Sequence, residues 1–279
     1  MGAAVLVRCL IRKHPGVSLL IMTTGVKTWV LLRGLTREQR HWEDFPAKLQ
    51  QCFPGAQVVT PDLPGNGKHA RIKSPANIRD MMLFLRNDIA SIISRDPVHL
   101  IGLAMGAMVA IEWMKSFPEE CAGSVLINTS LKGISPFYHR LRPQNYRLIL
   151  YALFTGNTRS REKTILGMTS NLYPDRETLL KHWVSYAEEN TVLPTNALRQ
   201  LIAAGRYRLP GLKPEVPVLV LNSKNDNLVN PQSSVSLAHD WTLPLATHPL
   251  AGHDIPLDDG DWVCEQITRW LAAGSAQGE

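Results

Sequence analysis

Short, mostly apolar runs alternate along the chain with longer segments whose apolar residues recur at helical spacing. The runs predict strands at Thr28–Leu32, Gln57–Thr60, Val98–Ile101, Ser124–Ile127, Val216–Leu221 and Leu243–His248. The longer segments predict helices at 42–53, 77–94, 107–117 and 262–272. Apolar strands separated by helix-length segments are typical of a parallel sheet covered on both faces. With right-handed crossovers, the pattern predicts an α/β fold with a doubly wound, mostly parallel sheet.

The alternation pauses between residues 134 and 213, where helical segments follow one another. The candidate helices are 146–154, 161–172, 175–189 and 194–207. An insertion between two strands of one sheet predicts a helical cap above the carboxyl ends of the strands, where such sheets bind ligands. We therefore predict three parts: an N-terminal extension or edge hairpin at 1–24, a core of 25–133 and 214–279, and a helical cap at 134–213.

A Gly-x-Ala-x-Gly turn joins one predicted strand to the helix that follows it. Gly102 and Gly106 have the spacing of a nucleophile elbow, in which the glycines let a strand turn sharply into a helix. The middle side chain then points into a site above the sheet, beside the free N–H groups of the helix N-terminus. That middle residue is Ala104, whose methyl group cannot attack a substrate.

A candidate acid and a candidate base follow the elbow in the order that this architecture uses, which is nucleophile, acid, base. Asp226 comes after the strand 216–221, and His253 comes after the strand 243–248. Asp226 alone is typical of a turn, and Asp254 adjoins His253 too closely to fold back onto its imidazole. The order of the three motifs nevertheless predicts that Ala104, Asp226 and His253 share one site.

Acyl transfer also needs N–H donors for a developing oxyanion. The backbone N–H of Met105, directly after the nucleophile position, is one candidate. The other is the N–H of Leu35, because Gly34 allows the preceding backbone to approach closely. Arg33 either contacts substrate or holds this loop in place.

Composition restricts the class of protein. The chain has 279 residues, 44% of them apolar and 19% charged, which indicates a globular protein. Four scattered cysteines without metal-ligand spacing predict reduced thiols in a cytoplasmic protein, with no metal or organic cofactor. No apolar stretch is long enough to predict a membrane span.

The excess of positive over negative charge lies in the predicted cap. Residues 134–213 hold 12 Lys/Arg and 5 Asp/Glu, whereas the remainder holds 18 and 19. The arginines include Arg140, Arg142, Arg147, Arg159, Arg161, Arg206 and Arg208. This excess either attracts an acidic partner or substrate, or is a solvated helical surface. Nucleic acid is disfavoured because no binding motif accompanies the charge.

From about Gly25 to Ala272 the chain resembles the α/β-hydrolase superfamily of serine esterases with a helical cap. The resemblance rests on Leu63–Gly67, the elbow 102–106, the acid loop 225–229 and the Gly-His pair 252–253. It implies hydrolysis of carboxylic esters through an acyl-enzyme. The basic cap is similar in layout to that of esterases that cleave the methyl ester of pimeloyl-acyl carrier protein, which implies an acidic carrier as one partner.

The chain departs from that pattern at two positions. Arg33 stands where many members have histidine, and Ala104 stands where they have serine. Three accounts of Ala104 are open: a serine replaced to trap substrate, a non-catalytic ligand-binding protein, or a reaction in which His253 and Asp226 activate water. Apolar side chains either line an acyl pocket or form the core of the cap; they include Leu148, Leu150, Phe154, Met168, Leu172 and Trp183.

Overall fold

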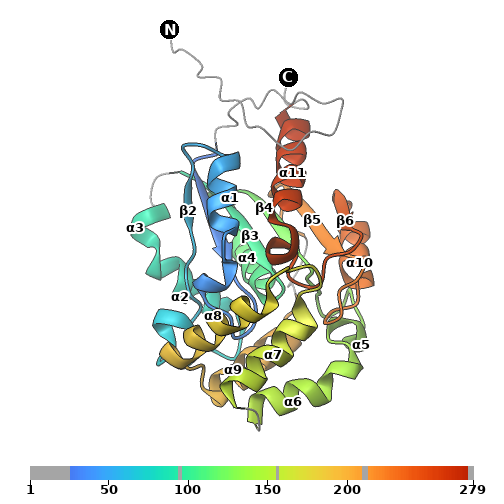
Figure 1. Cartoon of the computed structure of the whole chain (residues 1–279). Helices are drawn as coiled ribbons and strands as arrows, with labels where there is room; N and C mark the ends of the chain where they lie inside the picture. The colour runs from blue at the N-terminus through green and yellow to red at the C-terminus, as the bar shows by residue number, and fades with distance from the viewer. Residues whose placement is uncertain (1–25, 94–95, 155–156, 209–212, 276–279) are drawn as a thin grey trace.

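In the part of the chain that the structure describes, six parallel strands form one sheet in the order β2-β1-β3-β4-β5-β6 (Figure 1). The computed structural model describes residues 26–93, 96–154, 157–208 and 213–275. The strands are β1 (Thr28–Leu32), β2 (Gln57–Val59), β3 (Val98–Leu103), β4 (Cys121–Ile127), β5 (Val218–Ser223) and β6 (Leu245–His248). Every neighbouring pair is parallel. The predicted doubly wound α/β fold is confirmed.

Helices cover both faces of the sheet, which explains why its strands are apolar at successive positions. In β1, Trp29 and Leu31 pack on one side, with α1 (Phe45–Cys52) and α11 (Ile255–Ser275). Val30 and Leu32 pack on the other side. The helices on that side are α2 (Ile78–Asp88), α4 (Met105–Ser116) and α10 (Gln232–Trp241).

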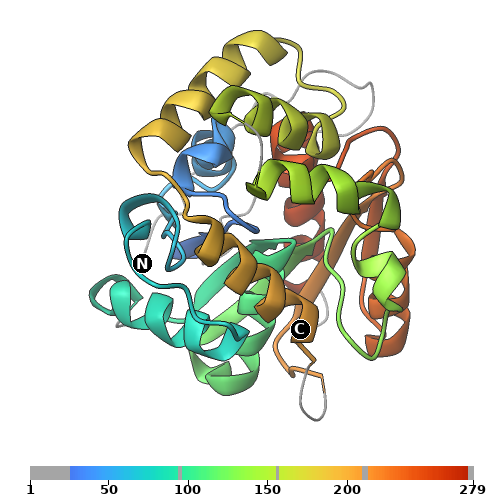
Figure 2. The same ribbon diagram turned by 90° about the horizontal axis from the view of Figure 1, so that it is seen from below.

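Between β4 and β5, in the segment where the sequence predicts a helical cap, the described residues form five α-helices. They are α5 (Phe137–Arg140), α6 (Tyr146–Phe154), α7 (Thr158–Thr169), α8 (Arg176–Glu189) and α9 (Pro194–Arg206). Figures 1 and 2 show α6 to α9 gathered at one end of the sheet. Helices α7 and α8 share a small apolar cluster that includes Leu166, Leu179 and Trp183.

Several predicted helices have different limits. The helix expected at 77–94 is divided at Ile89 into α2 and α3 (Ala90–Ile93). Helix α7 ends at Thr169 rather than at 172, because Ser170 is extended and its hydroxyl donates to Asp258. The remaining short elements are the 3-10 helices η1 (Gln39–Trp42), η2 (Gly67–His69), η3 (Pro118–Glu120) and η4 (Pro143–Asn145).

The final helix begins earlier than the sequence predicts, at Ile255 instead of 262. It is kinked at Asp259, whose backbone is non-helical (φ −154°, ψ 73°). Across the described residues, no helix combines the length and the apolar character that crossing a bilayer requires. The expected extension at 1–24 lies outside the described residues.

Candidate active site

The turn between β3 and α4 holds Ala104 in a conformation that alanine rarely adopts. Its φ of 54° and ψ of −112° lie in a region that favours glycine, and such strain is often found at functional sites. The N–H of Ala104 donates to the Ile127 carbonyl at 2.9 Å. Both flanking glycines are required: a Cβ on Gly106 would lie 2.0 Å from the Leu32 carbonyl oxygen, and one on Gly102 would lie 2.4 Å from Cα of Ala107.

The loop after β1 lies directly against this turn. A Cβ on Gly34 would be 3.3 Å from the Leu103 carbonyl oxygen and 3.4 Å from Cβ of Ala104. Leu35 follows Gly34, and Met105 is the first residue of α4, so its N–H has no partner within that helix. The structure therefore brings both predicted oxyanion donors to the edge of the sheet where Ala104 lies.

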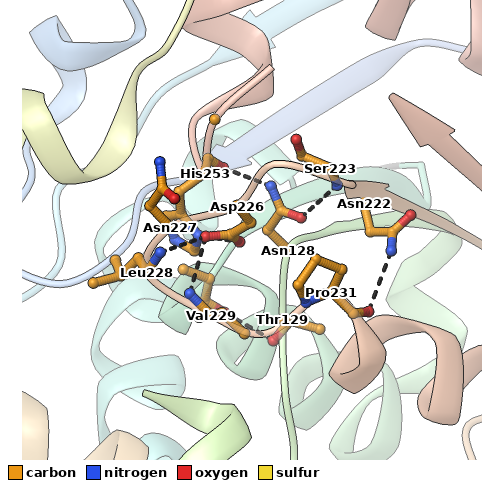
Figure 3. A network of polar contacts seen from close by, with 12 residues as sticks. Asn128, Thr129, Asn222, Ser223, Asp226, Asn227, Leu228, Val229, Pro231 and His253 are labelled. Atoms are coloured by element: carbon orange, nitrogen blue, oxygen red, sulfur yellow. Dashed lines mark hydrogen bonds and ion pairs between the residues drawn. The ribbon is translucent and has the colours of Figure 1, made fainter. Parts of the chain in front are cut away.

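His253 and Asp226 form a buried pair. Nδ1 of His253 lies 2.7 Å from Oδ2 of Asp226, and the side chains are 5% and 1% exposed. The other carboxylate oxygen, Oδ1, accepts from the backbone N–H groups of Leu228 (2.8 Å) and Val229 (2.9 Å) (Figure 3). Both Asp226 oxygens are thus engaged, which fixes the carboxylate and orients the imidazole.

Asn128 joins the strand ends to the histidine loop, a contact that the sequence analysis missed. Its amide group donates to the His253 carbonyl at 2.7 Å and accepts from the N–H of Ser223 at 2.9 Å (Figure 3). Asn128 is buried, has a positive φ of 46° and directly follows the apolar strand β4. A polar residue at the carboxyl end of a buried strand is the signal that could have identified it.

Ala104 and His253 line one cavity of about 630 Å³, behind which Asp226 is buried. The wall is mostly apolar and includes Leu35, Met105 and Met108. Of the other predicted pocket residues, Arg33, Gly34, Met168 and Trp183 also line this cavity. The side chain of Phe154 lies outside the described part of the chain.

Among the remaining apolar candidates, Leu150 lines the cavity, whereas Leu148 and Leu172 do not. Both of these are substantially exposed, and Leu172 lies beyond the end of α7. The expectation that they form an acyl pocket or the core of the cap is therefore wrong. Trp183 satisfies both alternatives, because it contacts the cavity and packs in the cluster of α7 and α8.

Arg33 is held by the residue next to the histidine. Its guanidinium donates to both carboxylate oxygens of Asp254, at 3.3 Å and 2.6 Å, and lies over the ring of Trp42 at 4.6 Å. Of the two roles expected for Arg33, this contact favours holding the loop. Asp254 faces Arg33 and does not replace Asp226 as the partner of His253.

A second buried arginine, Arg37, connects the loop after β1 to α7, and the sequence analysis missed it. It donates to Glu162 at 2.6 Å and lies 2.8 Å from Nε2 of His41. Burial, together with the positive charge of Arg37, lowers the pKa of His41 well below its usual value. His41 is therefore neutral and can accept a hydrogen bond from Arg37. No group of three metal-ligating side chains occurs among the residues described.

Comparisons with known proteins identify the family of this chain. A family model described as the alpha/beta hydrolase family matches residues 29–266. The chain belongs to the alpha/beta hydrolase family. The likeness to solved structures includes a thermophilic esterase from Thermogutta terrifontis, with 20% identity, 90% of each chain covered and a TM-score of 0.68. At that identity the likeness establishes the fold alone.

Two proteins named as hydrolases are similar to this chain in sequence. A 2-hydroxy-6-oxononadienedioate/2-hydroxy-6-oxononatrienedioate hydrolase from Paraburkholderia phymatum is 26% identical over 239 residues, which is 82% of this chain and 80% of that protein. A protein from Pseudomonas putida with the same name, numbered hydrolase 1, is 26% identical over 114 residues. That match spans only 40% of this chain and 40% of that protein. The expected membership of the hydrolase superfamily is confirmed.

Proposed function

We propose that this chain is the scaffold of a serine-type carboxylic ester hydrolase whose nucleophile position holds alanine. The observation that carries the proposal is the backbone of Ala104, which keeps the strained φ of 54° in a cavity shared with His253. A methyl group gains nothing from that conformation, whereas a serine hydroxyl would be presented to the imidazole. The Asp226–His253 pair beside it supports the same chemistry.

With serine at position 104, each group has a defined role. Asp226 keeps a proton on Nδ1 of His253, so Nε2 removes the hydroxyl proton as Oγ attacks the ester carbonyl carbon. The N–H groups of Leu35 and Met105 stabilise the oxyanion. His253 then protonates the departing alkoxide, leaving an acyl-enzyme. Water, deprotonated by His253, attacks that acyl group and releases the acid, and the proton returns to the serine oxygen.

As the chain stands, Ala104 cannot form the acyl-enzyme. Oxyanion donors and substrate binding alone retain a residual acceleration of about 10³–10⁴ over water in hydrolases that lack their nucleophile. We therefore propose that the present form is catalytically impaired and binds its ester in the cavity. Because the wall of the cavity is mostly apolar, the proposal favours an ester with an apolar acyl group.

The decisive experiment is the Ala104→Ser substitution, assayed on a panel of esters. The panel contains p-nitrophenyl esters of short and long acids and free and carrier-linked methyl esters. One compound that is not an ester, 2-hydroxy-6-oxononadienedioate, is added because two of the relatives are named after it. We expect kcat/KM for at least one ester to rise by up to about 10⁶-fold over the Ala104 form, which is the order of the loss when a serine hydrolase loses its nucleophile. The matched control, Ala104→Ser with His253→Gln, is expected to lose that gain.

The carrier-linked substrates test the role of the basic residues. Several of these arginines are engaged within the fold: Arg140 donates to the carbonyls of Ala204 and Gly205, and Arg159 pairs with Glu177. Equal rates for free and carrier-linked methyl esters, insensitive to salt, would argue against carrier docking.

A second candidate function is a non-catalytic ligand-binding protein. It is favoured by the combination of a methyl group at 104 with a large, mostly apolar cavity. In that case Ala104→Ser would fold and bind apolar carboxylic esters as tightly as the Ala104 form, yet stay inert on the whole panel. That outcome would overturn the esterase proposal.

A further inference from the structure

A second hollow lies on the other side of α9 from the active-site cavity. Ala197, Leu201 and Ala204 of α9 line the active-site cavity, whereas Arg199 and Arg206 line the second hollow. This hollow has a volume of about 620 Å³, and its wall also includes the start of α2. Helix α9 therefore contributes to the walls of both spaces. The proposed hydrolase chemistry makes no use of the second hollow.

Four arginines surround the second hollow, and its acidic groups are already engaged. The arginines are Arg79, Arg199, Arg206 and Arg208. Glu112 is buried and accepts from the Tyr207 hydroxyl at 3.1 Å, while Arg79 lies 3.6 Å away. The carboxylate of Asp80 accepts a hydrogen bond from the side-chain amide of Asn77. The backbone N–H of Asp80 donates to the side-chain oxygen of Asn77, which caps the N-terminus of α2. The wall thus carries four positive and two negative charges.

Three of the four arginines have no acidic partner among the residues that the structure describes. Within the stretches of chain that the structure describes, no salt bridge reaches Arg199, Arg206 or Arg208. Arg199 is half-buried, and its Nε donates to the Ser74 carbonyl, which anchors the guanidinium and leaves its outer nitrogens available. Arg206 and Arg208 are exposed on the same wall, so the surplus of positive charge around the hollow favours a bound anion.

We propose that this hollow binds the phosphate group of a small phosphorylated molecule. A phosphate monoester near neutral pH carries close to two negative charges, which matches the surplus of two positive charges, and its three outer oxygens suit the fork of an arginine. Pro75, Ala76, Ile78 and Ala203 add apolar wall, and the volume exceeds that of a phosphate group, so the organic part of the ligand has room beside them.

Titration calorimetry on the chain as it stands tests the proposal at low ionic strength. The probes are inorganic phosphate, glycerol 3-phosphate and adenosine 5′-monophosphate, with acetate as a monoanion control. We expect saturable, salt-sensitive binding of phosphate, weaker binding of acetate, and tighter binding of one of the two esters. The Arg199→Gln/Arg206→Gln variant is expected to bind phosphate at least tenfold more weakly.

The matched control is Arg147→Gln, which removes an exposed arginine of α6 that does not line the hollow. We expect this variant to bind phosphate as the parent does. Undiminished binding in the Arg199/Arg206 variant, an equal loss in the Arg147 variant, or no saturable binding by the parent would each overturn the proposal. Because binding is measured without turnover, the result is independent of whether Ala104→Ser creates an esterase.

Discussion

Arg33 and Asp254 form a buried, bidentate ion pair between the loop that carries Leu35 and the loop that carries His253. The two side chains are only 4% and 3% exposed. Arg33 leaves β1 and Asp254 precedes α11, so the pair joins segments 221 positions apart in the sequence. The N–H of Asp254 also donates to the Thr169 carbonyl at the end of α7. One pair of residues therefore connects the loop after β1, the histidine loop and the inserted helices.

Removing one member of this pair is expected to destabilise the fold strongly. Asp254→Leu leaves the guanidinium of Arg33 buried without its counter-charge, and such changes cost about 3–5 kcal/mol. The double variant Arg33→Met/Asp254→Leu is expected to lose less than Asp254→Leu alone, because no uncompensated charge remains. Urea unfolding measures these free energies. Glu265→Leu, which breaks the exposed pair with Arg269, serves as the control and is expected to change stability by less than about 1 kcal/mol.

Replacing Ala104 with glycine is expected to stabilise the protein. Glycine adopts a φ of 54° without the Cβ strain, which costs about 1–3 kcal/mol, although it also gains freedom in the unfolded chain. The net expectation is a gain of about 1 kcal/mol in the free energy of unfolding. Ala110→Gly, inside α4, is expected to lose at least about 1 kcal/mol. A loss of stability in Ala104→Gly would show that this turn is not strained.

The two glycines Gly106 and Gly167 are expected to respond in opposite ways to alanine. At Gly106 a Cβ would lie 2.0 Å from backbone oxygen of Leu32, which cannot move without separating α4 from β1. Gly106→Ala is expected to lower the free energy of unfolding by more than about 4 kcal/mol, or to prevent folding. At Gly167, inside α7, no atom outside the adjoining residues and backbone of the helix lies within 4 Å of that position, so alanine is expected to add up to about 1 kcal/mol. Thermal unfolding followed by circular dichroism distinguishes the two.

The strands and the order of the main motifs could be predicted because they follow local rules. Strand β1 occupies Thr28–Leu32 as expected, since its residues are buried on both faces and their apolar character is continuous. The Gly-x-Ala-x-Gly spacing likewise identifies the elbow, because only glycine fits at Gly102 and Gly106. Asp226 and His253 could be paired because each follows a strand at the same edge of a parallel sheet.

What could not be predicted depends on contacts between distant segments. The end of α7 is set by Asp258, whose carboxylate accepts from Ser170 and from the N–H of Asn171. The bridge made by Asn128 requires knowing that β4 and β5 are neighbours. The buried pair of Arg37 and Glu162 joins residues 125 positions apart, and neither residue type suggests burial by itself.

His99 is expected to make the stability of the protein depend on pH. Its ring is buried in β3 against Trp29, with ring centres 4.9 Å apart, and burial lowers its pKa to about 4. The unfolded chain has the ordinary value of 6.5 and therefore binds more protons than the folded protein between about pH 6.5 and 4. The contribution of this group is fully present above pH 6.5 and is lost as the pH falls through that window.

Urea unfolding at pH 7.5 and pH 4.5 measures this effect. Acidification over that range is expected to reduce the free energy of unfolding of the parent by about 2–3 kcal/mol more than that of His99→Leu, because only the parent must keep the imidazole of His99 uncharged. His239→Gln, which removes a histidine that is 88% exposed, is expected to behave like the parent. If His99→Leu loses as much stability on acidification as the parent does, other groups cause the pH dependence, and the buried His99 is not held neutral by the fold.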